Sequence, residues 1–116
     1  MKIKTMQELL EAKVVCCEEN LDRQVYSACG CDLMSDVLAY VKDQAVLLTG
    51  LVNPQVIRTA EMMDMICIVF VRSKAPSEEM LRLAEESGIV VMSTDKRLYE
   101  ACGLLYANGL VGSKNE

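Results

Sequence analysis

Three short segments carry the side chains best placed for binding chemistry. Each segment follows an apolar run typical of a buried strand and precedes residues that can begin a helix. In open parallel sheets, ligands gather outside the carboxyl ends of the strands, where the N–H groups of the following helices favour anions. We therefore expect these loops to bind a small anionic or nucleotide ligand. The candidate ligand-binding residues are Thr49, Gly50, Asn53, Arg72, Ser73, Lys74, Ser93, Thr94 and Asp95.

A second interpretation of the same loops stays open. Hydroxyl and amide side chains are also the caps and turns that any strand-to-helix connection needs. The loops contain no glycine-rich fingerprint, and the nearest approach to a phosphate-binding loop, residues 109–114, has the wrong spacing and precedes no helix. The sequence thus offers groups suited to an anion without a motif that requires one.

Catalytic groups are sparse along the chain. The absence of histidine excludes Ser–His and Cys–His nucleophile pairs within one chain. The carboxylate pairs Glu78-Glu79 and Glu85-Glu86 fall on one predicted helix, where such pairs are typical of a hydrated face. We expect no enzymatic activity, no catalytic residue and no cofactor.

Six cysteines supply the remaining reactive groups, at positions 16, 17, 29, 31, 67 and 102. The chain begins without an apolar signal sequence, so we expect a cytoplasmic location in which thiols stay reduced. Cys29 and Cys31 are the weak candidates for a soft metal, but no C-x-x-C and no histidine completes a site. We expect structural thiols and no metal site, with a thiol-based redox or iron–sulfur accessory role as the alternative.

Composition and charge narrow the class of partner. The chain has 116 residues, of which 52% are hydrophobic and 25% charged, a balance typical of one domain with its own core. The net charge is −5 and no basic patch is present, so we expect no nucleic-acid binding. The longest apolar run, Met65–Val71, is far shorter than the roughly 20 residues that span a membrane.

Helix and strand signals alternate along the chain. Thr5 is expected to cap a helix over residues 6–11, Asp32 or Ser35 a helix through Asp43, and Asn53-Pro54 a third. A fourth is predicted to begin at Ala75-Pro76 and end at Gly88, and a fifth to run from residues 93–95 to Ala107. The predicted strands are residues 12–17, 24–29, 45–48, 65–71 and 89–92.

Apolar strands without alternation, joined by single helices, indicate a parallel sheet buried on both faces. The predicted fold class is α/β, a small single domain with a mostly parallel sheet of four or five strands flanked by helices. We place the domain at residues 1–110 and a flexible tail at 111–116. For the helix from Asp32 or Ser35, we expect an apolar face of Leu33, Val37, Leu38, Tyr40 and Val41.

Methionine is unusually frequent, with eight copies against four Tyr, one Phe and no Trp. Most of these flexible side chains are expected in the core, and any exposed part would mark a contact surface. Small domains commonly pair by two-fold symmetry, so we expect a homodimer. A purely structural dimerisation module is therefore a further alternative, and a protein partner is also considered.

Two segments resemble one known family. Residues 31–39 (CDLMSDVLA), followed by residues 46–50 (VLLTG), are similar to the DRTGG domain family, and residues 84–95 are similar to the end of that family. The similarity covers about residues 3–108. It implies a fold like the N-terminal domain of bacterial HPr kinase/phosphorylase, an α/β unit without catalytic groups.

The resemblance also implies a role. Family members are fused to CBS pairs and to phosphotransacetylase-like enzymes, and are taken to be regulatory, ligand-sensing or dimer-forming. Some stand-alone members are associated with iron–sulfur and hydrogenase systems. Where the family's threonine-glycine-glycine loop is expected, this chain has Val71–Lys74, and the nearest remnant of that loop is Thr49-Gly50. The resemblance thus implies a non-catalytic regulatory domain, and kinase activity is not carried over.

Overall fold

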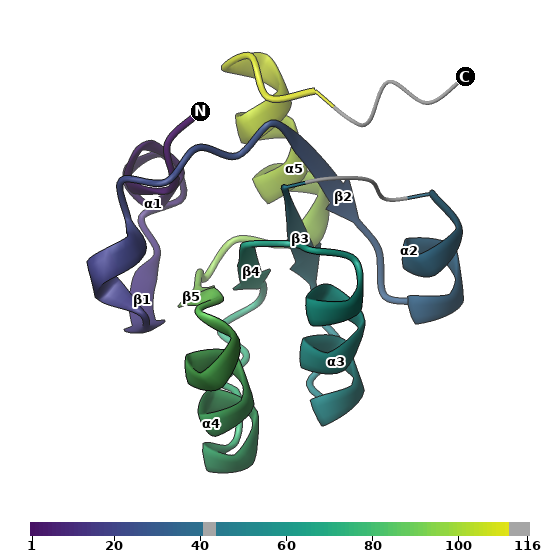
Figure 1. Cartoon of the computed structure of the whole chain (residues 1–116). Helices are drawn as coiled ribbons and strands as arrows, with labels where there is room; N and C mark the ends of the chain where they lie inside the picture. The colour runs from purple at the N-terminus through teal and green to yellow at the C-terminus, as the bar shows by residue number, and fades with distance from the viewer. Residues whose placement is uncertain (41–43, 112–116) are drawn as a thin grey trace.

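Five strands form one central sheet with helices on both faces (Figure 1). The computed structural model describes residues 1–40, excepting the side chain of Tyr40, and residues 44–111. The strands lie in the order β1-β5-β4-β3-β2. They are β1 (Lys13–Cys16), β2 (Ser27–Gly30), β3 (Ala45–Thr49), β4 (Cys67–Phe70) and β5 (Val90–Ser93).

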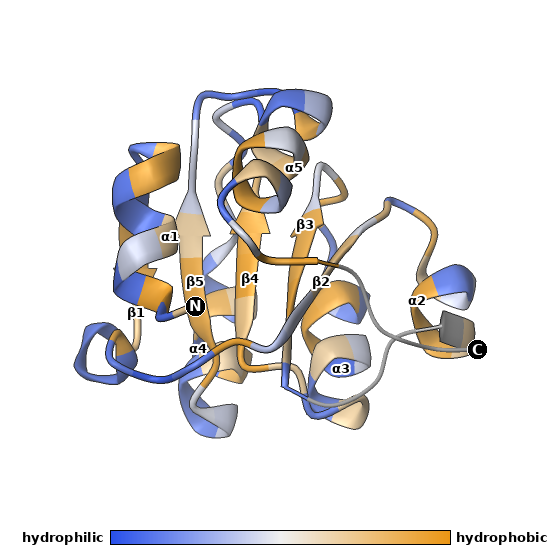
Figure 2. Cartoon of the chain, turned by 90° about the horizontal axis from the view of Figure 1, so that it is seen from above, coloured by the Kyte–Doolittle hydropathy of each residue, from blue (hydrophilic) through white to orange (hydrophobic). Residues whose placement is uncertain are grey.

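The sheet is parallel from β2 to β5, and only β1 runs antiparallel to its neighbour β5. The predicted α/β class with a mostly parallel sheet of four or five strands is confirmed. Strands β3 and β4 are buried along their whole length, because helices cover both faces of the sheet. In Figure 2 the central strands β3, β4 and β5 are predominantly hydrophobic and lie between helices of mixed hydropathy.

The helices form two outer layers. They are α1 (Ile3–Leu10), α2 (Met34–Tyr40), α3 (Pro54–Met62), α4 (Glu78–Ser87) and α5 (Leu98–Ala107), with a short 3-10 turn η1 (Glu18–Asn20). Helices α1 and α5 pack together on one face and α3 and α4 on the other, while α2 packs beside α3 (Figure 1). Within the described residues, no helix combines the length and apolar character needed to cross a membrane.

Two helix ends follow the predicted local chemistry. Asn53 caps α3, its side-chain oxygen accepting from the Gln55 N–H at 2.8 Å, and Pro54 fills the first position. Gly88 ends α4 in the left-handed conformation at φ 71°, which glycine adopts without a Cβ clash. These ends depend only on neighbouring residues, so the sequence predicts them well.

Three predicted helix starts are wrong by two to five residues. Helix α1 begins at Ile3 and not after Thr5, because the carbonyls of Arg23 and Leu21 accept from the Ile3 and Lys4 N–H groups in place of a cap. Helix α4 begins after Ser77, whose hydroxyl accepts from Met80 N–H at 3.3 Å. Helix α5 begins at Leu98, because the polar residues before it bond elsewhere.

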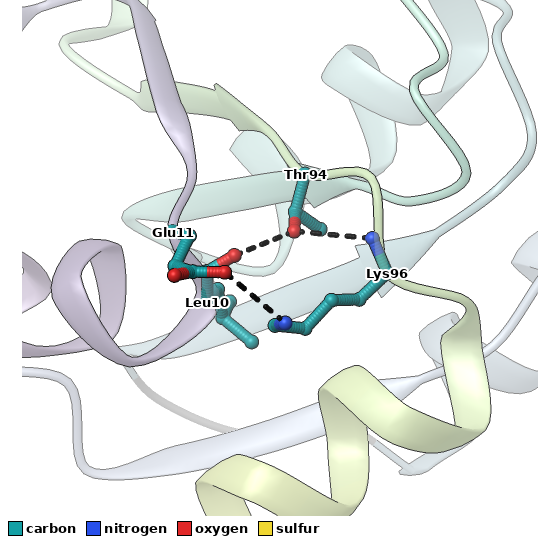
Figure 3. A network of polar contacts seen from close by, with 4 residues as sticks. All are labelled: Leu10, Glu11, Thr94 and Lys96. Atoms are coloured by element: carbon teal, nitrogen blue, oxygen red, sulfur yellow. Dashed lines mark hydrogen bonds and ion pairs between the residues drawn. The ribbon is translucent and has the colours of Figure 1, made fainter.

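Thr94, one of the polar residues before α5, belongs to a hydrogen-bond network within the fold (Figure 3). It is only 2% exposed; its hydroxyl donates to Leu10 O at 2.7 Å and accepts from Lys96 N–H at 3.3 Å. Lys96 Nζ also lies 3.5 Å from a Glu11 carboxylate oxygen. The network fastens the end of α1 to the loop after β5.

Helix α2 buries a narrower face than expected. Met34 and Val37 are buried, whereas Leu33 and Leu38 are 58% and 42% exposed. The helix packs beside α3 at the β2 side of the sheet, so one stripe is covered. The predicted extension to Asp43, with Val41, lies outside the described residues, as does the side chain of Tyr40.

Most methionines contribute to the core, as predicted. Met6, Met34, Met65, Met80 and Met92 are buried, whereas Met62 is 70% exposed. The exposed part of the predicted methionine contact surface is thus Met62, at the end of α3. The domain boundary at 110 remains a prediction.

Candidate ligand-binding site

The first predicted loop is fixed by a carboxylate that precedes α2. Asp32 Oδ1 accepts from the Thr49 hydroxyl and from the Gly50 N–H, both at 2.8 Å. The Thr49 hydroxyl oxygen in turn accepts from Leu51 N–H at 3.1 Å. The loop after β3 therefore has its polar groups arranged by a residue from the preceding strand-to-helix connection, between β2 and α2.

Sequence reasoning assigned Asp32 only a capping role and missed this contact. The signal was available in part, because Asp32 stands in the segment most specific for the family resemblance. What could not be seen is that β2 and β3 are adjacent and in parallel register, with Gly30 opposite Leu48. That register carries the residues following both strands to the same edge.

Arg72 joins the second loop to the first. A Cβ atom built on Gly50 would lie 2.5 Å from Arg72 Nη2, so the guanidinium lies across the glycine. Glycine leaves that space open, whereas a Cβ atom there would force the end of the arginine side chain to move. The approach places a cation on the loop that Asp32 organises.

The second and third loops are hydrogen-bonded to one another. Arg72 and Ser73 are both left-handed, each with φ 58°, a conformation that costs non-glycine residues about 1–2 kcal/mol. Their N–H groups donate to the carbonyls of Lys96 and Thr94, both at 2.8 Å. The Ser73 hydroxyl donates to Asp95 Oδ1 at 2.5 Å. These bonds offset the backbone strain and hold the second and third loops together.

The groups left for a ligand are fewer than the sequence offered. Thr49 and Thr94 direct their hydroxyls to Asp32 and to Leu10 O, and Asn53 uses its side-chain oxygen as a helix cap. The Ser93 hydroxyl donates to Lys74 O at 2.7 Å. Among the described residues, the side chains of Arg72 and Lys74 are exposed and have no ion-pair partner. These two cations are the exposed positive charges that remain at this edge.

Comparison with known proteins identifies the family. The family model for the DRTGG domain matches residues 5–107. The chain belongs to the DRTGG domain family. No curated protein matches it. A solved structure of the CBS and DRTGG domains of the regulatory region of Clostridium perfringens pyrophosphatase, complexed with its activator diadenosine tetraphosphate, has the same fold, with a TM-score of 0.74 at 16% identity. The match covers 90% of this chain and 45% of that one.

The cysteines of this DRTGG domain are poorly suited to thiolate chemistry. Burial raises the pKa of the Cys16 thiol to about 12, with the Cys17 thiol adding to the shift. Burial likewise raises the pKa of Cys29 to about 11, and raises the pKa of Cys67 and of Cys102. Because the thiolate is the nucleophile and metal ligand, these protonated thiols are weak in both roles near neutral pH.

Of the C-x-C pair of the DRTGG domain, Cys31 is engaged by hydrogen bonds to its own turn. The Cys31 sulfur accepts from Leu33 N–H at 3.3 Å and donates to Leu33 O at 3.4 Å, at the turn before α2. In the part of the chain that is described, no group of three or more Cys, Asp or Glu side chains is arranged to hold a metal ion. The redox or iron–sulfur accessory role remains a prediction.

Proposed function

We propose that this DRTGG domain is a non-catalytic regulatory module that senses a phosphorylated ligand of the nucleotide class. The ligand's phosphates bind at the carboxyl edge of the sheet, between the loops after β3 and β4. Binding there changes how the domain meets its partner, and no bond in the ligand is broken.

The observation that supports this proposal is the position of Arg72 over Gly50. Its guanidinium offers a planar set of donors that matches phosphate oxygens, and Lys74 adds a second charge two residues on. The loop is held by the third loop through Ser73 and Asp95, so the cation is positioned before the ligand arrives. Preorganised donors of this kind reduce the cost of binding.

The nucleotide class is supported by the pyrophosphatase region that shares the fold, because that protein is complexed with diadenosine tetraphosphate. Its activator carries four phosphates between two nucleosides, and a chain of phosphates would suit two neighbouring cations. The carboxylates of Asp32 and Asp95 are each engaged by hydroxyl or N–H donors, which lowers their repulsion of an anion.

Thermal unfolding with added ligand tests the proposal. A ligand at 100 times its Kd should add about 2.7 kcal/mol, or on the order of 10 °C in Tm for a domain of this size. We expect diadenosine tetraphosphate or ATP to raise Tm, and Arg72→Gln and Gly50→Ala each to reduce the rise. Arg82→Gln, an exposed arginine on α4, is the matched control. No response to either nucleotide would rule out the ligand part of the proposal.

We also propose that the domain self-associates as a homodimer. The exposed apolar side chains of Leu33, Leu38 and Val52, on or next to α2 and α3, support a contact surface on that side. Sedimentation velocity should give a dimer, and Leu38→Asp should shift it to monomer, while Tyr106→Asp, an exposed position on α5 at the other face of the sheet, does not. A wild-type monomer at every concentration would contradict the homodimer, and a protein partner would then be sought for the same surface.

A further inference from the structure

A hollow of about 620 Å³ lies at the opposite edge of the sheet from the site described above. It opens where β3, β4 and β5 begin, beside the end of α3, and under the segment that leads into β2. In Figure 2 that segment passes the ends at which β5 and β4 begin, on its way from β1 to β2. The volume is within the range of pockets that hold small molecules, about 300–1,000 Å³.

The hollow combines an apolar floor with a free aromatic ring. Ile66 and Ile89, buried at the starts of β4 and β5, are among its lining residues. Tyr26 also lines it and is 65% exposed, although its backbone N–H is fixed to Gln44 O at 3.0 Å. A ring with an open face on a fixed backbone is a platform on which a heterocyclic base can stack.

The polar groups of the rim match the rest of a nucleoside. Gln44 follows the aromatic platform, and a glutamine amide pairs with adenine through the N6 and N7 edge. Glu61 and Asp64 place two carboxylates at the end of α3, and carboxylates accept hydrogen bonds from ribose hydroxyls. Among the described residues, none of these three side chains has a hydrogen-bond or ion-pair partner inside the protein.

The charge of the rim opposes a phosphate chain. Arg23 supplies one positive charge against the two carboxylates, so the hollow is negative by one charge. This is the reverse of the carboxyl edge, where Arg72 and Lys74 are exposed. We propose that the hollow is a second site that binds an uncharged purine nucleoside, of the adenosine type, with the base on Tyr26 and the ribose hydroxyls on Glu61 and Asp64.

Titration of the whole chain with adenosine, followed by backbone amide NMR, tests the second site. We expect saturable shifts at Tyr26, Gln44, Ile66 and Gly88. The variant Tyr26→Ser should weaken binding about tenfold, the loss typical of one removed stacking contact. Tyr99→Ser is the matched control, because Tyr99 on α5 is 89% exposed and does not line the hollow.

Two further measurements keep the test decisive. On the unaltered protein, 2′,3′-dideoxyadenosine should bind more weakly than adenosine, because it lacks the hydroxyls that the carboxylates accept from. Asp64→Asn should have a similar effect, and asparagine tolerates the left-handed backbone at that position, φ 56°.

The outcomes separate this site from the proposed function. Adenosine shifts confined to residues 49–50 and 72–74 would overturn the second site while supporting the carboxyl edge. Absence of saturable shifts at millimolar adenosine, or equal affinity in Tyr26→Ser, would also overturn it. A Tm response to ATP that survives in Tyr26→Ser would leave the proposed function intact in either case.

Discussion

The two ends of the sheet use their polar side chains in different ways. At the carboxyl edge, Asp32, Ser73 and Thr94 are hydrogen-bonded within the fold, so most polar groups hold the loops. At the amino edge, where the parallel strands begin, the side chains of Gln44 and Glu61 have no such partner among the described residues. They line the hollow described above. Most polar side chains at the carboxyl edge thus stabilise the fold, whereas those of Gln44 and Glu61 stay available for a ligand.

The largest loss of stability is expected from substitution of Thr94. Thr94→Val keeps the shape of the buried side chain but leaves Leu10 O and Lys96 N–H without their partner. We expect the free energy of unfolding to fall by about 2 kcal/mol, measured by urea denaturation. Ser93→Ala, which removes an exposed hydroxyl from Lys74 O, should cost less. Equal losses in the two variants would contradict the special role of the buried network.

Alkaline pH should lower the free energy of unfolding through the thiols on the two outer strands, β1 and β2. The raised pKa values of Cys16 on β1, about 12, and Cys29 on β2, about 11, exceed the value of 9.0 for an unperturbed thiol. The unfolded chain therefore loses protons first, so stability is full below pH 9 and falls as pH rises toward the folded pKa values. Each thiol contributes a slope of up to about 1.4 kcal/mol per pH unit.

Urea denaturation under reducing conditions, repeated between about pH 8 and 10, measures this slope. Cys29→Ala should make the decline shallower, since one of the shifted groups is removed. An unchanged slope would show that the thiol on β2 is not protected in the folded state.

A smaller loss is expected at Asp32. Asp32→Ala removes the acceptor for Thr49 Oγ1 and Gly50 N–H, and because Asp32 is exposed we expect about 1 kcal/mol of destabilisation. The effect on nucleotide binding should be larger in proportion, because the loop under Arg72 loses its anchor. Asp36→Ala, also exposed at the start of α2, is the control and should leave the nucleotide response unchanged.

The smallest effect is expected at the amino edge. Glu61→Gln should change the free energy of unfolding by no more than about 0.5 kcal/mol, as for surface substitutions without a structural partner. Thermal unfolding of the two proteins in the same buffer measures it. A loss above about 1 kcal/mol would place this carboxylate in the fold and remove the contrast between the edges.

The sequence predicts what local chemistry decides. The cap at Asn53, the stop at Gly88 and the buried runs of β3 and β4 depend on neighbouring residues and strand burial. The meeting of the Thr49, Arg72 and Ser93 loops was predicted because parallel strands end at one edge. The antiparallel direction of β1 was not, since its pairing with β5 joins segments far apart in the chain.

The candidate site was predicted less completely than the fold. Asp32 was assigned to the wrong role because its partners Thr49 and Gly50 come from the next strand. The hollow could not be predicted at all, because residues 23–26, 61–66 and 87–89 meet only after the sheet is assembled. Pattern and periodicity describe single elements, whereas both of these features arise between elements.

The place of β1 in the sheet has a consequence for biosynthesis. Its only strand partner in the described chain is β5, which begins at Val90, so the earliest-made strand of this sheet waits for the latest. At about 5–20 residues per second, that interval is roughly 4–15 s. During it, the edge of β1 has no partner strand within the described chain, and this early segment is where a nascent-chain chaperone would have most to protect.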